Sequence, residues 1–184
     1  MIIAIEGHDG VGKTTLAKAL AQRLGFKYIK HQVKEILDVD DDKCLEIMEN
    51  VIKSNNATLI AWFLAFNDMC ALQMNENAVL DRHSLLNYYW NGTPETEDIF
   101  QLSQELSGKP DLTILLTASN EVRTDRIKKR DGNDADLQNN TIMRADNGKL
   151  LDYLEKYKLT HIVIDTDNLT EKEVEDIAFS QLIF

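Results

Sequence analysis

The feature that most constrains this chain is a glycine-rich loop close to its N-terminus. Residues 7–14 have the sequence Gly-His-Asp-Gly-Val-Gly-Lys-Thr, the G-x-x-x-x-G-K-T pattern of a phosphate-binding loop. The apolar run 2–6 precedes the loop and is typical of a buried parallel strand. Residues 15–25 follow with leucines at helical spacing and a glycine where a helix would end. Strand, loop and helix form the context that this motif requires.

The residue types of the loop explain its chemistry. Glycines let the backbone turn tightly, so that N–H groups come close to phosphate oxygens. The helix that follows directs its first N–H groups at the same anion. Lys13 is expected to reach the β- and γ-phosphates, and the Thr14 hydroxyl to ligate Mg²⁺. The motif predicts a nucleoside triphosphate bound at Gly7, His8, Asp9, Gly10, Val11, Gly12, Lys13, Thr14 and Thr15.

The bulk composition limits the class of protein. The 184 residues suffice for one well-buried domain, which we expect to span the whole chain. The net charge of −11 argues against binding to nucleic acid polymers or anionic membranes, because both need a basic surface. Cys44 and Cys70 lack metal-site spacing and fit a reducing compartment. With no secretory signal before the first strand and no bilayer-spanning apolar run, we expect a cytoplasmic protein.

Strand-like and helix-like segments alternate along the chain. Strands are predicted at 2–6, 26–30, 78–81, 111–117 and 161–165. Helices are predicted between them, including 43–54, 57–75, one that starts at 93–95, one after Ser119 and one opened by a capping box at 170–173. This order predicts a three-layer α/β sandwich of the P-loop NTPase type, with a five-stranded parallel sheet and helices on both faces. Ligands bind such sheets at the carboxyl ends of the strands.

Several segments resemble the thymidylate kinase family. The loop 6–15 carries an Asp at the same inner position, and residues 80–83 (Leu-Asp-Arg-His) resemble the family's Asp-Arg-aromatic motif. Residues 109–116, 123–130 and 162–166 are similar to its fourth strand, the helix that enters its lid, and its last strand. The resemblance is collinear over nearly the whole chain. It implies a P-loop nucleoside monophosphate kinase that uses ATP and Mg²⁺.

The resemblance also implies roles for the basic residues. Lys13, Arg82 and Arg130 are expected to act in catalysis. Arg82 would span donor and acceptor, because a guanidinium can hold phosphate oxygens in a bidentate manner. Arg126 lies four residues before Arg130, shares its helical face and is expected to bind ATP. The polar segment at about 130–142 is expected to form a lid that excludes water.

Two aspartates each have two interpretations. Asp81 is expected either to act at the magnesium site with Thr14 or to cap the next helix. Asp9 is expected either to accept a hydrogen bond from a sugar hydroxyl or to serve as a turn-forming residue.

The acceptor side departs from the family. Residues 30–32 are Lys-His-Gln where the family usually carries Arg-Glu-Pro, and a lysine can hold phosphate only as a point charge. The helix expected at 57–75 contains no Arg or Lys, although the family places a phosphate-gripping arginine there. The residues expected to bind the acceptor are Asp9, Lys30, Phe63, Phe66, Asn67, Arg82 and Trp90.

Three functions remain open on these grounds. The first is a kinase acting on a nucleoside monophosphate, with dTMP or a related deoxynucleotide expected. The second is a deoxynucleoside kinase, whose neutral hydroxyl acceptor needs a carboxylate base such as Glu35 or Asp68. The third is a nucleotide-binding regulator with weak kinase activity. A GTPase is excluded because the chain lacks an Asn-Lys-x-Asp sequence. Dimers are common in the resembled family, so a homodimer formed through the apolar helix is also expected.

Overall fold

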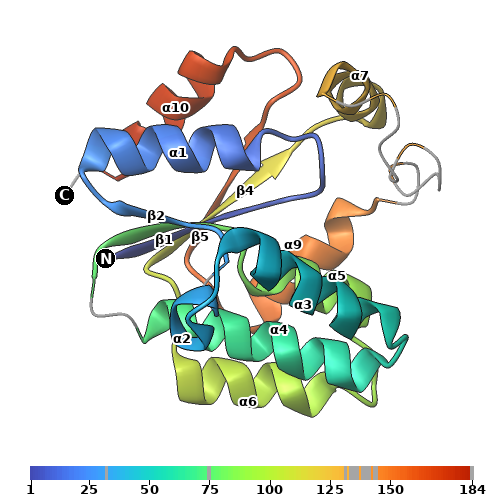
Figure 1. The fold of residues 1–184 in the computed structure, drawn as a ribbon. Helices are drawn as coiled ribbons and strands as arrows, with labels where there is room; N and C mark the ends of the chain where they lie inside the picture. The colour runs from blue at the N-terminus through green and yellow to red at the C-terminus, as the bar shows by residue number, and fades with distance from the viewer. Residues whose placement is uncertain are drawn as a thin grey trace.

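Five parallel strands form the centre of the protein (Figure 1). The computed structural model describes residues 1–31, 33–73, 76–130, 132, 137, 142 and 145–182. The strands are β1 (Ile2–Glu6), β2 (Lys27–Ile29), β3 (Ala78–Asp81), β4 (Leu112–Thr117) and β5 (His161–Asp165). They are arranged in the order β2-β3-β1-β4-β5, and every neighbouring pair is parallel. The predicted parallel α/β fold is confirmed.

The central strands are apolar because helices cover both of their faces. In β1, Ile3 lies opposite Val79 of β3 on one side and Leu112 of β4 on the other. Ile3 and Val79 are fully buried, and Leu112 is nearly so. Because the strands are parallel and aligned, β1 and β3 end together, and the loops that follow them meet at one edge of the sheet.

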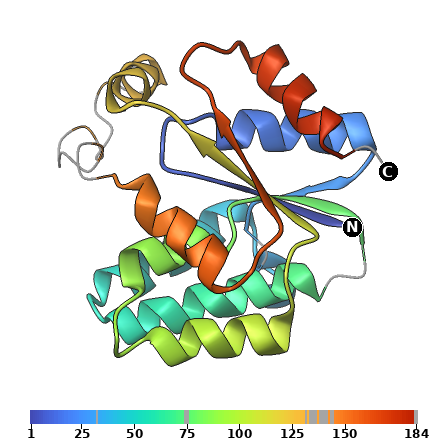
Figure 2. The same ribbon diagram turned by 180° about the vertical axis from the view of Figure 1, so that it is seen from behind.

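Two layers of helices enclose the sheet, as Figures 1 and 2 show. One layer consists of α1 (Lys13–Leu24) and α10 (Glu171–Ser180), whose apolar residues share a core with β1 and β4. The other layer holds α4 (Ala57–Leu72), α5 (Ser84–Asn91), α6 (Glu97–Ser107) and α9 (Asn147–Lys156). The short α2 (Lys34–Leu37) and α3 (Asp41–Lys53) lie next to α4, and α7 (Asn120–Arg130) lies beyond the carboxyl end of β4.

Most predicted element boundaries agree with the structure to within two or three residues. The helix expected to start at 93–95 is an exception, because α6 begins at Glu97. Thr93 and Thr96 form a turn there instead, in which the Thr96 hydroxyl donates to the Asn91 carbonyl at 2.5 Å and accepts from Thr93 N at 2.9 Å. Helix α5 contains residues 87–91 of the segment 87–92, which resembles a helix segment of the thymidylate kinase family.

Some predictions fall outside the described residues. The end of the helix predicted at 57–75 does, because residues 74–75 are not described, and α4 ends at Leu72. Most of the predicted lid at 130–142 also does, since only residues 130, 132, 137 and 142 are described there. Across the part of the chain that is described, no helix has both the length and the hydropathy needed to cross a membrane.

Candidate active site

The glycine-rich loop lies between β1 and α1, where backbone sterics select glycine. Gly7 has φ +134°, and a Cβ there would stand 2.2 Å from the Leu116 carbonyl oxygen of β4. Gly12 has φ +99° and is the N-cap of α1. L-residues rarely adopt these conformations, so the glycines are what allow the chain to turn sharply from strand into helix. The turn leaves the N-terminus of α1 at the carboxyl edge of the sheet.

Lys13 lies under the loop with only 5% of its surface exposed. Its Nζ donates to the His8 carbonyl oxygen at 2.8 Å and is 3.4 Å from Asp9 Oδ1. Burial, followed by the positive charge of Arg82, lowers the pKa of Lys13 to about 8. An anion bound at the loop would offset both effects, so a phosphate is the natural partner of this ammonium group.

Arg82 reaches the same aspartate from the end of β3. Its Nη2 donates to Asp9 Oδ1 at 2.5 Å, so Lys13 and Arg82 approach one carboxylate oxygen. Burial opposes ionisation of Asp9, but the two cations outweigh it and lower the pKa of Asp9 to about 2. Two cations held this close to each other form a site suited to the oxygens of a polyphosphate.

Asp81 lies where β3 ends and is 1% exposed. Its Oδ2 accepts from the Thr14 hydroxyl at 2.7 Å and from the Tyr28 hydroxyl at 2.9 Å. Its Oδ1 is buried and has no hydrogen-bond partner among the described residues. Mg²⁺ prefers hard oxygen ligands, and a threonine hydroxyl beside a carboxylate with an unused oxygen fits that preference. Asp81 does not cap the next helix, which was its alternative interpretation, because Glu6 accepts the hydrogen bonds from the start of α5.

Two arginines of α7 bind the backbone of the loop. Arg126 donates to the Gly10 carbonyl at 3.4 Å and to the Thr166 hydroxyl and carbonyl at 2.8 and 2.7 Å. Arg123 is 4% exposed and donates from Nε to the Asp9 carbonyl at 2.7 Å. Sequence reasoning did not select Arg123, although its spacing of three residues from Arg126 places both on one side of the helix.

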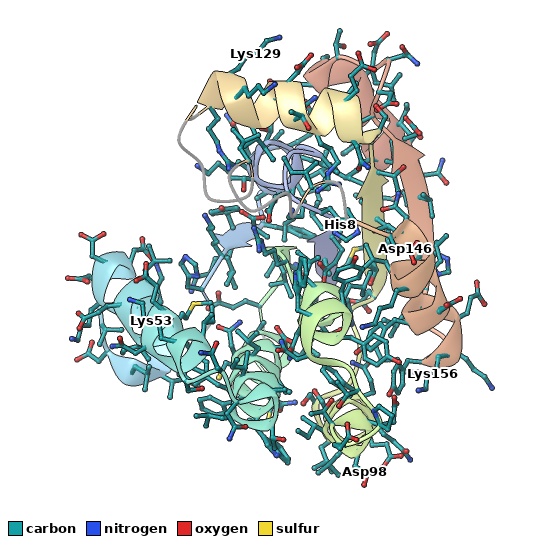
Figure 3. The ribbon with its side chains drawn as sticks, turned by 90° about the vertical axis from the view of Figure 1, so that its right-hand side faces the viewer. His8, Lys53, Asp98, Lys129, Asp146 and Lys156 are labelled. Atoms are coloured by element: carbon teal, nitrogen blue, oxygen red, sulfur yellow. The ribbon has the colours of Figure 1, made fainter. Side chains whose placement is uncertain are left out.

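A cavity of about 640 Å³ opens above the loop. In addition to the loop, it is lined by basic side chains that directly follow β2 and β3 or belong to α7: Lys30, Arg82, Arg126, Lys129 and Arg130. Figure 3 labels Lys129 on α7. Thr166, Leu169, Glu171 and Val174 form the wall on the side of α10, where Glu171 is the one acidic side chain among them. A concentration of cations in a chain of net charge −11 marks the cavity as an anion site.

Comparisons with known proteins agree with this geometry. The model of the family described as AAA domain matches residues 3–145. The chain belongs to that family. It is 29% identical to a protein named probable thymidylate kinase from Archaeoglobus fulgidus, over 96% of this chain and 92% of the relative. It is 26% identical to a cytidylate kinase from Sulfurisphaera tokodaii, over 100% of this chain and 96% of the relative. The expected family, the P-loop nucleoside monophosphate kinases, is confirmed.

Solved structures extend the comparison to the fold. The deoxyadenosine kinase from M. mycoides, solved with the products dCMP and a flexible dCDP bound, superposes with a TM-score of 0.65. The two share 20% identity, and the match covers 99% of this chain and 98% of the other. The same kinase with bound dCTP gives a TM-score of 0.62 at 21% identity. At this level of identity the similarity shows the fold alone.

His8 has a packing role in this P-loop kinase. It is 3% exposed, its ring meets Tyr89 edge-on at 4.7 Å, and Nε2 lies 3.4 Å from the Asp146 carbonyl oxygen. Figure 3 shows His8 beside Asp146 at the edge of the sheet. Burial and the charge of Arg123 lower the pKa of His8 to about 4, so the ring is neutral at pH 7. The side chain fastens the loop to α5 and to the start of α9.

Of the residues expected to bind the acceptor, Asp9, Lys30 and Arg82 line the 640 Å³ cavity, and the other four lie apart from it. Asn67 is 8% exposed and accepts from Val33 N at 3.1 Å, and Phe63 packs against the apolar cluster around Val33. Phe66 is 38% exposed on α4, and Trp90 is 53% exposed on α5. None of these four lines the 640 Å³ cavity, and their acceptor roles remain predictions.

Lys30 joins the donor cavity to a second one. The second cavity has a volume of about 500 Å³, and the two share Thr14 and Lys30 as lining residues. Three further lysines line it, Lys18, Lys27 and Lys34, and sequence reasoning did not select them. They come from three different elements, so no local motif could have grouped them.

The two candidate bases of the deoxynucleoside kinase alternative have different outcomes. Asp68 is 4% exposed within α4, and burial, reinforced by the charge of Glu6, raises its pKa well above the usual range. It lines neither cavity. The side chain of Glu35 lies outside the described part of the structure.

Proposed function

We propose that this protein transfers the γ-phosphoryl group of ATP to a nucleoside monophosphate, with dTMP or a related deoxynucleotide as the first acceptor to test. The observation that carries the proposal is the meeting of Lys13 and Arg82 at Asp9 Oδ1, at 3.4 and 2.5 Å. One cation comes from the phosphate loop and the other from the end of the neighbouring strand. A phosphoryl group in transit between donor and acceptor needs positive charge from both sides.

The residues of the loop would perform the donor half of the reaction. The bond between the γ-phosphorus and the bridging oxygen of ATP breaks, and a bond to a phosphate oxygen of the acceptor forms. The products are ADP and a nucleoside diphosphate. Lys13 and the N-terminus of α1 would neutralise charge on the β- and γ-phosphates. Thr14 and Asp81 would hold Mg²⁺, which supplies further positive charge when bound.

The acceptor phosphate would lie between Arg82 and Lys30. Both line the 640 Å³ cavity on the side of β2 and β3, opposite Thr166 and Leu169. Similarity over 96% of the chain to a relative named as a thymidylate kinase supports a monophosphate acceptor. Lys30 would replace the arginine that is missing from α4, holding phosphate as a point charge.

A neutral nucleoside is the second candidate acceptor. One observation favours it: α4 contains no Arg or Lys that could hold an acceptor phosphate. The fold match to deoxyadenosine kinase is consistent with that acceptor. Asp68 is a weak base candidate, because it is buried away from both cavities.

The test is an acceptor screen with ATP and Mg²⁺ over all nucleosides and nucleoside monophosphates. Lys13→Ala serves as the control for contaminating kinases. Turnover of a monophosphate that Lys13→Ala lacks would support the proposal, and Lys30→Met should then raise KM for that acceptor with little change in KM for ATP. Turnover of nucleosides alone would establish the second candidate. ATP binding without any acceptor turnover would contradict both and favour a regulator.

A further inference from the structure

Glu6 is a buried carboxyl group that the proposed mechanism does not use. It is the last residue of β1, directly before the phosphate loop, and its exposed fraction is zero. A carboxyl group buried this completely needs hydrogen bonds. Its Oε1 accepts from His83 N at 2.8 Å and from Leu85 N at 2.9 Å. Both donors belong to the backbone that follows Arg82.

These two N–H groups are the donors that open α5. The first N–H groups of a helix have no partner within the helix. The N-cap residue of α5, His83, makes no side-chain cap hydrogen bond. Glu6 therefore caps α5 from a different strand, 79 residues before Leu85 in the sequence.

Arg82 lies in the bend between β3 and this cap. Its backbone is left-handed, with φ +87°, which is costly for a residue with a side chain. Arg82 N donates to the Ile5 carbonyl at 3.0 Å, so adjacent residues of β1 hold the chain at Arg82 and just after it. This fixed bend directs the guanidinium to Asp9 Oδ1.

We propose that Glu6 is the positioning residue for Arg82: by accepting the His83 and Leu85 N–H groups, it holds the strained bend that aims the guanidinium into the phosphate site. The inference rests on the proposed function, in which Arg82 binds the transferred phosphoryl group. Glu6 itself touches no substrate.

The role requires an oxygen at the correct reach and no negative charge. Burial raises the pKa of Glu6 to about 7, although its bonds to Leu85 and His83 favour the carboxylate. Its Oε2 has no hydrogen-bond partner among the described residues. Glutamine keeps the same reach and a carbonyl acceptor, whereas aspartate keeps the charge and is one methylene too short for both bonds.

The decisive comparison is therefore Glu6→Gln against Glu6→Asp. We expect Glu6→Gln to keep kcat within about threefold of wild type. We expect Glu6→Asp to lower kcat by about 10- to 100-fold, the scale of a 1 Å misplacement, with a smaller change in KM for ATP. The reverse order would mean that charge is what matters, and it would overturn the proposal. Thr96→Val, which removes the buried hydroxyl that donates to the Asn91 carbonyl at the other end of α5, controls for general destabilisation.

A double-mutant cycle tests whether Glu6 acts through Arg82. In an Arg82→Ala background, Glu6→Asp should cause no further loss of kcat, because the guanidinium is already absent. Losses of kcat that multiply in the double variant would overturn the proposal.

The same cycle can be measured without any acceptor, as binding of inorganic tripolyphosphate by calorimetry. A failed acceptor screen therefore leaves this second test intact. We expect Arg82→Ala and Glu6→Asp each to weaken binding by about tenfold, and the double variant no more. Unchanged binding in Arg82→Ala would also overturn the proposal.

Discussion

At the scale of single residues, the site is a set of cations arranged around one carboxylate. Asp9 holds Lys13 and Arg82 in the positions that phosphate oxygens would otherwise stabilise. Without such a group, two cations this close would repel each other, and the effect of Arg82 on the pKa of Lys13 reflects that repulsion. Asp9 thus has a structural role in addition to any contact with a sugar hydroxyl.

The left-handed backbone of Arg82 gives a prediction about stability and activity together. Glycine adopts φ +87° without strain, whereas alanine does not. We expect Arg82→Gly to be more stable than Arg82→Ala by about 1 kcal/mol in denaturant unfolding. Both variants should lose phosphoryl transfer by about 100-fold or more, because neither provides the guanidinium. Equal stability of the two variants would show that the bend carries no strain.

At the scale of helices and strands, most of the candidate site is formed by strand ends and helix starts. The phosphate loop, the Arg82 bend and the start of α7 all lie where a strand passes into a helix. Some of these helix starts are capped by a group from elsewhere in the fold, as Glu6 caps α5, and others by a group from their own first turn. The start of α10 is of the second kind: Thr170 Oγ1 accepts from Glu173 N, and Glu173 Oε2 accepts from Thr170 N at 2.8 Å.

The capping box of α10 predicts a local change in stability. Thr170→Ala should lower the free energy of unfolding by about 1 kcal/mol, since it leaves a helical N–H group without its acceptor. The melting temperature should fall by about 2–4 °C in thermal unfolding. Ser180→Ala, at the other end of the same helix, should leave the melting temperature within about 1 °C, because its hydroxyl donates only to the Ile177 carbonyl one turn before it. Equal shifts in both variants would argue against a cap effect.

At the scale of the whole molecule, buried titratable groups make stability depend on pH. Burial lowers the pKa of His83 to about 4, and the residue is buried at the start of α5. Unfolding returns it to its ordinary pKa near 6.5. Between these values the unfolded chain binds the proton more tightly, so stability is lost as the pH falls from about 6.5 towards 4. Glu6, whose pKa is raised to about 7, acts in the opposite direction.

A difference measurement isolates His83 from the other groups. Between pH 7 and pH 4, wild type should lose about 3 kcal/mol relative to His83→Gln in denaturant unfolding, because glutamine does not titrate. A constant difference between the two proteins over this range would mean that the pKa of His83 is the same in the folded and unfolded states, so that burial does not shift it.

The homodimer remains a prediction at this scale. Leu59, Trp62 and Phe66 are exposed on α4, but nothing in the structure shows a partner.

The sequence alone was sufficient wherever one local pattern carries the physics. The loop 7–14 requires glycines in order, the strands require apolar runs, and the capping box at 170–173 requires two residues three positions apart. Each of these constraints operates within a few residues, and the structure has each where the pattern indicates it. The family resemblance followed from the same local motifs.

The tertiary structure alone decided which groups meet across the sheet. Asp81 is bound by Thr14 and Tyr28, Arg123 holds the Asp9 carbonyl, and Glu6 caps a helix that begins 78 residues later. The pairing of parallel strands sets these contacts, because it brings the ends of β1, β3 and β4 together regardless of the residues between them. On the acceptor side, the predicted residues of α4 and α5 lie apart from the cavity that Lys30 and Arg82 line, and the sequence contains no motif that would have separated the two groups.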